Sequence, residues 1–429
     1  MGRARQLASN ENQDRILLNA SAASTDEGEH LLLDASAVGT DAGFFFNTEI
    51  GTTETPPEGF VIESSLATNA VTNTKVADDA VTVSKIDSAA QSLSNRNLIK
   101  NGSMRVHQRT GTITLGNNAF TYTLDRMGFY KSNAGTQTVE QSTDAPVGFD
   151  NSLLVKNTSE DGTVASGDRV AFIYRMEGLD AAKLEFGTVN AKTITISWYV
   201  KSTVNGKFGG AVGNGSDNRA YPFLYDIFAP NQWERKSVTL AGDTAGTWVT
   251  TNARDLQVAL GLGVGSTYSG TAGAWEAADR NSATGASTTW LETVDAEWAM
   301  TGFQIEIGSE ATEFEHTDIA HDIIKCQRYY RRYGGQTAFE HLPGIGQGNG
   351  SGGMMHHELP VEMRAAPTFA VDGDWRINDL YLGGYYTLSS EGIDNATRNM
   401  VRVHFATSSA IGSDLGRMLA YNDTTAKWE

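Results

Sequence analysis

Four aromatic residues are the side chains of this sequence best suited to bind a ligand. Trp248, Tyr268, Trp275 and Trp290 each stand in a stretch rich in Gly, Thr, Ala and Ser, which is typical of loops in β proteins. Exposed rings on a rigid β scaffold stack on sugar faces or form protein interfaces. Alternatively, the rings cover a core or an oligomer seam, since aromatic side chains are more often buried than exposed. We take all four as candidate ligand-binding residues, with both interpretations open.

Signatures of catalysis are absent from the sequence. It contains no Walker A, H-E-x-x-H or G-x-S-x-G motif. Residues 348–353 (GNGSGG) match G-x-G-x-x-G, but that motif needs a preceding strand and a following helix, and a Gly-rich loop is expected here. Glu313 and Glu315 lie close together, yet in a chain with 51 acidic residues nothing marks them as a glycosidase pair. The sequence therefore predicts a protein that is not an enzyme and needs no cofactor.

Metal-ligating patterns are equally sparse. The single cysteine, Cys326, excludes an intrachain disulfide and a cysteine-based zinc cage. His356 and His357, followed by Glu358, offer metal ligands if three chains meet on an axis. The alternative is a strand in which one of the two histidines is exposed. We predict no resident metal.

Charge restricts the partners. Of 429 residues, 33 are Lys or Arg and 51 are Asp or Glu, which gives a net charge of −18. Duplex nucleic acid and anionic membranes need positive charge to bind, so neither is an expected partner. No apolar run approaches the ~20 residues of a membrane helix, and no secretory pattern begins the sequence. We expect a soluble protein without membrane insertion, which repels anionic polysaccharide unless salt or cations intervene.

Two internal repeats distinguish the first hundred residues. Residues 15–22 (RILLNASA) recur at 30–37 (HLLLDASA), and each copy predicts a short apolar strand followed by a turn. Residues 69–76 (NAVTNTKV) are echoed at 79–86 (DAVTVSKI). Neither kind of unit can bury an apolar face on its own. The repeats therefore predict either a shaft shared between partner chains or a linker.

Strand patterns dominate from about residue 97. In the segment 193–200, Ile194, Ile196, Trp198 and Val200 alternate with Thr193, Thr195, Ser197 and Tyr199. Similar alternation runs through 256–264 and 303–307, and glycines at 206, 209–210, 213 and 215 predict turns between strands. Many strands in succession indicate an antiparallel sandwich.

One amphipathic helix is expected over 317–335. Ile319, Ile323, Cys326 and Tyr330 share a helical face, and Thr317 or Asp318 can cap its start. Arg331 and Arg332 would occupy its last turn, before the stop at Gly334-Gly335, and residues 342–353 would form a Gly-rich loop. Short strands then return, with Val401, Val403 and Phe405 alternating against Arg402 and His404, which indicates a smaller β domain.

An ordered series of segments resembles bacteriophage tail fibres and receptor-binding proteins. It begins with residues 97–109 (NLIKNGSMRVHQR) and 122–126 (YTLDR), after which Met127 stands where that family has Trp. The series continues with 233–248 (WERKSVTLAGDTAGTW), 301–315 (TGFQIEIGSEATEFE), 326–330 (CQRYY) and 359–368 (LPVEMRAAPT). The residues at 69–86 are similar to the shaft or linker repeats of the same fibres. The resemblance covers about residues 97–370.

The resemblance implies a mainly β chain that assembles as a homotrimer. Its parts are an N-terminal virion-attachment region (1–60), a repeat linker or shaft (61–96), a jelly-roll domain similar to carbohydrate-binding modules (97–316), a connecting helix (317–335) and a C-terminal β domain (336–429). The implied function is that of a short tail fibre, an adhesin in the virion tail that is assembled in the host cytoplasm. It would dock on other virion proteins by its N-terminal region and bind a host surface glycan or protein with its distal domains. No catalytic residues belong to this family's pattern.

Two alternatives remain at this level. The same modules suit a capsid-attached fibre or a structural adaptor between the tail and a separate adhesin. A glycan-depolymerising tailspike is the third interpretation, although the sequence lacks the long parallel β-helix repeat typical of such enzymes.

Overall fold

The computed structural model describes residues 15–19, 30–34, 95–109, 111–334, 341–342, 345–348, 352–372, 375–379, 384–407, 416–420 and 425–428. The chain forms two compact units, 1–85 and 86–429. In the first unit, β1 (Arg15–Asn19) pairs antiparallel with β2 (His30–Asp34), so that Leu17 lies opposite Leu32. The first repeat thus forms a strand in each copy, as predicted. The second repeat and residues 35–94 lie outside the described residues.

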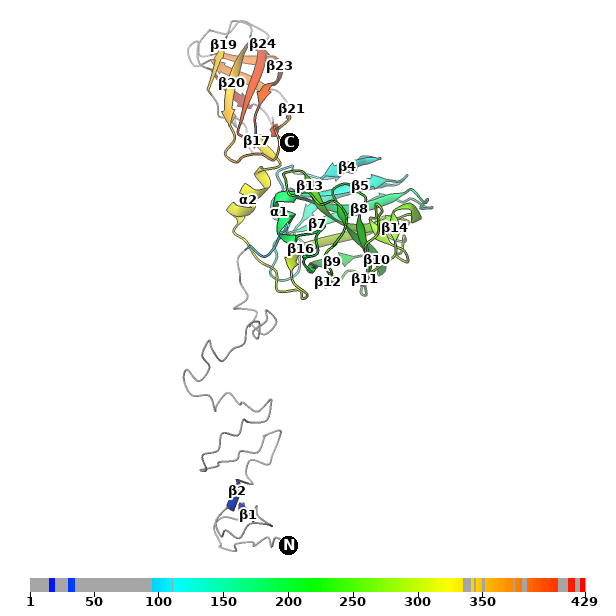
Figure 1. Ribbon diagram of the computed structural model, residues 1–429. Coiled ribbons are helices and arrows are strands. Elements are labelled where there is room, and N and C mark those ends of the chain that lie inside the picture. Colours follow the sequence, from blue (N-terminus) through cyan, green and yellow to red (C-terminus); the bar gives the residue numbers. More distant parts are fainter. Residues whose placement is uncertain are drawn as a thin grey trace. The chain divides into compact units, whose positions relative to one another are not determined.

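The second unit begins with a sandwich of two six-stranded antiparallel sheets (Figure 1). The order in one sheet is β11 (Ala220–Ile227), β10 (Gly206–Asn214), β13 (Arg254–Val264), β8 (Arg169–Glu177), β5 (Met127–Ser132) and β4 (Ala119–Tyr122). The order in the other is β12 (Glu234–Leu240), β9 (Ile194–Ser202), β16 (Glu297–Ile307), β7 (Ser152–Ser159), β6 (Thr136–Ser142) and β3 (Ile113–Thr114). This architecture confirms the predicted jelly-roll sandwich.

Side chains from both sheets meet in one hydrophobic core. Ile194, Ile196, Trp198 and Val200 of β9 are all fully buried, as their alternation predicts. Trp198 packs edge-on against Tyr225 of the opposite sheet, with ring centroids 5.1 Å apart. Such perpendicular pairs contribute to stability beyond the area they bury. The strand periodicity therefore located the core correctly.

The glycines of β10 contradict the predicted turns. Gly209, Gly210 and Gly213 lie inside this strand instead of in loops. A Cβ on Gly209 would lie 2.1 Å from the Ser282 hydroxyl oxygen, and one on Gly210 would lie 2.6 Å from the Ala259 carbonyl oxygen. Glycine is needed here because neighbouring chain segments approach the strand closely. The spacing of glycines alone does not distinguish this use from a turn.

Short elements connect the strands of the sandwich. α1 (Gly178–Ala181) and the 3-10 turn η5 (Ala182–Leu184) follow β8 directly, and a second 3-10 turn, η6, spans Ser266–Tyr268. β14 (Ser269–Gly270) pairs parallel with β15 (Ser282–Ala283).

The connecting helix is shorter than predicted. α2 spans Ile319–Gln327 and begins as expected, because the Asp318 carboxylate accepts a hydrogen bond from the Ala320 amide at 2.8 Å. The predicted end near 335 is wrong, since residues 331–334 form strand β17 (Arg331–Gly334). The side chain of Arg328, the residue after the helix, binds Glu177 of the sandwich. The helix therefore ends next to this tertiary contact, before Arg331 and Arg332, which the prediction placed in its last turn.

The buried side of α2 also differs from the prediction. Cys326 and the following Tyr330 are buried, but Ile319 and Ile323 are 36% and 37% exposed. Asp322 takes the buried position and accepts a hydrogen bond from the Thr317 hydroxyl at 2.7 Å. No helix in the described part of the chain is long and apolar enough to cross a membrane.

The C-terminal strands form two further sheets. One has the order β17, β26 (Thr425–Trp428) and β21 (Phe369–Asp372). The other has the order β18 (His341–Leu342), β25 (Gly416–Ala420), β22 (Trp375–Asp379), β23 (Gly384–Ala396), β24 (Met400–Thr407), β20 (Gly352–Glu358) and β19 (Ile345–Gly348). Val401, Val403 and Phe405 are buried, which confirms the predicted alternation in β24.

The predicted loop over 342–353 is partly strand. β19 and β20 pair antiparallel, and Gly348 lies opposite Gly353. Gly348, Gly352 and Gly353 of the G-x-G-x-x-G match therefore lie in two antiparallel strands, not in the strand-to-helix turn that the motif needs. In β20, His356 is exposed and His357 is buried, as the strand alternative for these two residues predicted.

Candidate functional site

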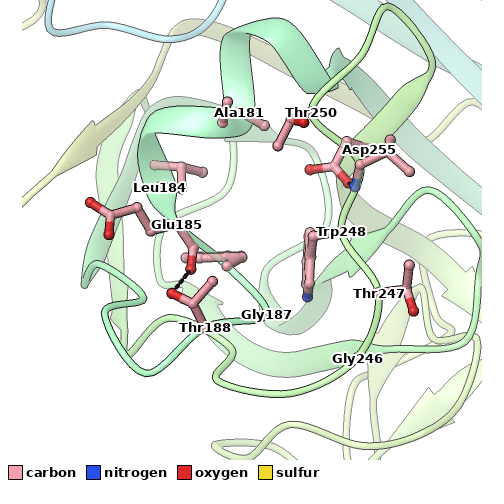
Figure 2. Close-up of a pocket in the computed structure, with 13 residues that line it drawn as sticks. Ala181, Leu184, Glu185, Gly187, Thr188, Gly246, Thr247, Trp248, Thr250 and Asp255 are labelled. Atoms are coloured by element: carbon pink, nitrogen blue, oxygen red, sulfur yellow. Dashed lines mark hydrogen bonds between the residues drawn. The ribbon is translucent and has the colours of Figure 1, made fainter.

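One cavity of the sandwich lies beside α1. Its volume is about 400 Å³, and it is lined by residues of two segments, 181–188 and 246–250, together with Asp255 (Figure 2). We call it the Trp248 cavity. It forms because the chain leaves β8 through α1 and η5 while the segment before β13 passes alongside. Backbone amides of Gly178 and Leu179 donate to the carbonyls of Ala253 and Thr251, both at 2.9 Å, and hold the two segments together.

Glycines permit this close passage of the two segments. A Cβ on Gly178 would lie 2.3 Å from the Val249 carbonyl oxygen, and one on Gly187 would lie 3.0 Å from Cδ1 of Trp248. Gly187 and Gly246 also have positive φ, at +80° and +79°, which other residues adopt only with strain. The wall of the cavity therefore depends on glycine at these positions.

Trp248 forms one wall of the cavity. Figure 2 shows its indole ring nearly edge-on, with one face toward the opening and Leu184 across that opening. Its Nε1 donates to the Ala245 carbonyl at 3.1 Å, and Phe186 packs perpendicular to it at 4.9 Å. Trp275 packs perpendicular to the same indole at 5.8 Å. These contacts hold the ring in a fixed orientation beside the cavity.

Asp255 contributes the polar group of this site. It is 4% exposed, and one carboxyl oxygen accepts a hydrogen bond from the Val249 amide at 2.5 Å. Among the described residues no cation lies within ion-pair distance, and burial raises the pKa of this carboxyl to about 6. Figure 2 shows its other oxygen directed toward the opening. The cavity thus combines an aromatic face with a carboxylate that has no cation partner in the described part of the chain.

The four predicted aromatic residues have different positions. Trp248 lines the cavity. Trp275 packs against Trp248 without lining the cavity, and its Nε1 donates to the Ala241 carbonyl at 2.9 Å. Tyr268 lies elsewhere: Cζ of Arg169 is 3.7 Å from its ring centroid and 3.9 Å from that of Tyr130. Trp290 is 1% exposed and belongs to the core cluster, so we remove it from the candidate site. The structure brings two of the four together.

Sequence reasoning missed Asp255 and the segment 181–188. Asp255 is one of 51 acidic residues and stands directly before an alternating strand, where nothing in its neighbours signals burial. The segment 181–188 has no motif of its own. Both can be identified as parts of the site only from the structure, which places residues 181–188 beside residues 246–250.

No family model matches the chain, and no curated protein matches it. Among solved structures, it is similar to the enzymatically active domain of tailspike protein 4 of bacteriophage CBA120, with 11% identity and a TM-score of 0.27. That match covers 50% of this chain and 22% of the tailspike domain. The chain is also similar to a family 11 carbohydrate-binding module of Clostridium thermocellum in complex with a mixed-linked tetrasaccharide, with 11% identity and a TM-score of 0.24. That match covers 48% of this chain and 99% of the module.

Proposed function

We propose that the sandwich binds a glycan in the Trp248 cavity, and that the chain is a non-enzymatic adhesin of a bacteriophage tail. The observation that carries the glycan proposal is the pairing of the Trp248 ring face with the Asp255 carboxylate in one cavity. A sugar ring offers C–H groups that stack on an aromatic face and hydroxyls that donate to a carboxylate. The volume of about 400 Å³ lies in the range of roughly 300–1,000 Å³ that small-molecule sites occupy.

The energetics of Asp255 support a role in binding. A buried carboxylate without a cation partner lowers stability, because desolvation disfavours its charged form. Groups of this kind gather at functional sites more often than elsewhere. A sugar hydroxyl donating to the free oxygen of Asp255 would compensate part of this cost in the bound state.

The tail-fibre part of the proposal rests on the ordered series of segments over 97–370 and on the short repeats before it. In this account, residues 1–60 dock on the virion, three chains form the fibre, and the distal domains meet the host. Many weak sites per virion then give strong attachment through effective concentration. The protein would be located in the virion tail.

Full-length protein on a glycan array, together with its inhibition of virion adsorption, tests the proposal. We expect binding to a limited set of glycans and competition with the virion for the host surface. Failure of the purified chain to bind any glycan or susceptible cell would contradict it. Release of new reducing ends from a bound polysaccharide would instead favour a depolymerase.

A further inference from the structure

A second, smaller cavity concentrates positive charge in this acidic protein. Its volume is about 110 Å³, and its lining includes Arg109, Arg126, Arg364, Asp125 and Tyr329. Three arginines against one carboxylate leave a formal excess of two positive charges, in a chain whose net charge is −18. We call it the Arg126 cavity. It does not share a residue with the Trp248 cavity.

The buried member of this group is Arg126. It is 6% exposed, and its guanidinium stacks on the ring of Tyr329, with Cζ 3.5 Å from the centroid. One terminal nitrogen donates to the Arg175 carbonyl, whereas the buried Nε has no acceptor among the described residues. No carboxylate of the described residues lies within ion-pair distance of Arg126. A buried guanidinium in this situation is costly unless an anion completes its hydrogen bonds.

The nearby carboxylate does not fill this role. Both oxygens of Asp125 accept hydrogen bonds from Gln108, one from the backbone amide and one from Nε2, each at 2.6 Å. Burial raises the pKa of Asp125, against the hydrogen bonds from Gln108 and the charges of Arg109 and Arg126, which lower it. Arg126 therefore keeps donors for another partner.

Two further arginines flank the cavity in fixed positions. The guanidinium of Arg109 lies over the ring of Tyr330, 3.6 Å from its centroid. Arg364 is exposed and donates from one terminal nitrogen to the Asn252 carbonyl at 3.3 Å. The planar guanidinium group presents its donors in a geometry that suits bidentate contact with a carboxylate, phosphate or sulfate.

We infer that the Arg126 cavity binds an oxyanion group, and that on the host this group is an anionic substituent of the surface glycan. The second half of this inference rests on the proposed function. A volume of about 110 Å³ is enough for one carboxylate, phosphate or sulfate group. The other acidic residues repel such a ligand only weakly beyond the Debye length of about 8 Å in physiological salt.

Thermal unfolding of the full chain in sodium phosphate, sulfate or glucuronate tests the site, with chloride at equal ionic strength as the reference. We expect a saturable rise of Tm with the oxyanions that chloride does not produce. Arg364→Ala should weaken this binding at least about tenfold, since one charge-assisted contact is lost. Lys207→Gln is the matched control, because it removes one positive charge from an exposed pair with Asp226 outside both cavities.

Arg126→Met should abolish the rise of Tm with oxyanions. If that variant does not fold, the oxyanion binding of Arg364→Ala decides the test. Equal Tm values in phosphate and chloride, or unchanged binding in Arg364→Ala, would overturn the site. Trp248→Ala should leave phosphate binding intact, which separates this inference from the proposed function. For the glycan part, Arg364→Ala should lower binding of acidic glycans only. An equal loss with neutral glycans, or no loss with acidic ones, would overturn that assignment.

Discussion

Arg328 and Glu177 form a bidentate ion pair: Nη2 lies 2.5 Å from Oε1, and Nε lies 3.0 Å from Oε2. Glu177 ends β8 of the sandwich, and Arg328 directly follows α2. The guanidinium nitrogen Nη1 of Arg328 also donates to the Glu362 carbonyl at 3.0 Å. One side chain thus ties the sandwich to the segment that leads into the C-terminal strands.

Arg328→Ala should lower the free energy of unfolding by about 3 kcal/mol at pH 7, because it leaves the Glu177 carboxylate buried without its cation. Burial raises the pKa of Glu177, but hydrogen bonds from Arg328 and Tyr329 outweigh it, so the pKa lies below its ordinary value. A carboxylate with a lowered pKa stabilises the fold at neutral pH and loses this effect as pH falls through the folded-state pKa. Urea unfolding should therefore show a smaller effect of Arg328→Ala at pH 3.

Lys156→Ala is the control for this experiment, since its pair with Asp295 is exposed on both sides and should contribute little to stability. Equal losses from the two substitutions, or a loss independent of pH, would contradict the account of the Arg328 pair.

Asp255→Asn should stabilise the protein in alkaline solution. In the folded chain the pKa of Asp255 is about 6, above its value in the unfolded chain. At a pH between these two pKa values, the folded state therefore binds more protons at Asp255 than the unfolded state does. Wild-type stability therefore falls as pH rises through this window, by about 3 kcal/mol at most. Asn removes the charge and can still accept from Val249. Melting curves should show a higher Tm for the variant at pH 8 and equal values near pH 4.

The exposed Asp150 provides the matched substitution, because its pair with Arg105 lies in solvent and Asp150→Asn should leave Tm unchanged at both pH values. A variant Asp255→Asn that is less stable than wild type at pH 8 would show that the carboxylate has a stabilising partner.

Trp290 and Trp248 should differ in their contribution to folding. Trp290→Ala should lower the free energy of unfolding by about 3–5 kcal/mol, because this ring is 1% exposed and fills the core. Trp248→Ala should cost clearly less, since one face of that ring borders the cavity. Chemical unfolding of both variants measures the difference. A larger loss for Trp248→Ala would place it in the core and remove it from the site.

The glycines inside β10 should not accept a side chain. Gly210→Ala would place Cβ 2.5 Å from the Phe223 ring and 2.6 Å from a backbone oxygen, which we expect to cost about 1–3 kcal/mol. Gly162→Ala is the control, because a Cβ there meets nothing within 4 Å. Similar unfolding free energies for the two variants would show that β10 shifts freely to make room.

Local patterns predicted those features that depend on neighbours in the sequence. The alternation of Ile194 and Trp198 identifies a buried strand face, and Asp318 identifies the start of α2, because both signals act within a few residues. Arg328, the residue after α2, binds Glu177, which lies about 150 residues earlier, and no local signal reports that contact.

In the candidate site, too, local sequence predicts some features and long-range contacts determine the others. Trp248 and Trp290 stand in stretches of similar composition, yet one borders a cavity and the other fills the core. Asp255 acquires its raised pKa only from the burial that the crossing segments impose. Sequence therefore identifies candidate rings, and tertiary packing selects among them.

Calorimetric titration of the full chain with the glycan that binds best on an array measures whether the Trp248 cavity is the glycan site. Trp248→Ala should weaken binding at least about tenfold, which corresponds to roughly 1.4 kcal/mol for the lost ring contact. Trp233→Ala is the control, since Trp233 is a partly buried surface tryptophan that does not line the cavity, and it should bind as wild type does. Unchanged affinity in a folded Trp248→Ala variant would contradict the claim that the Trp248 cavity is the glycan site.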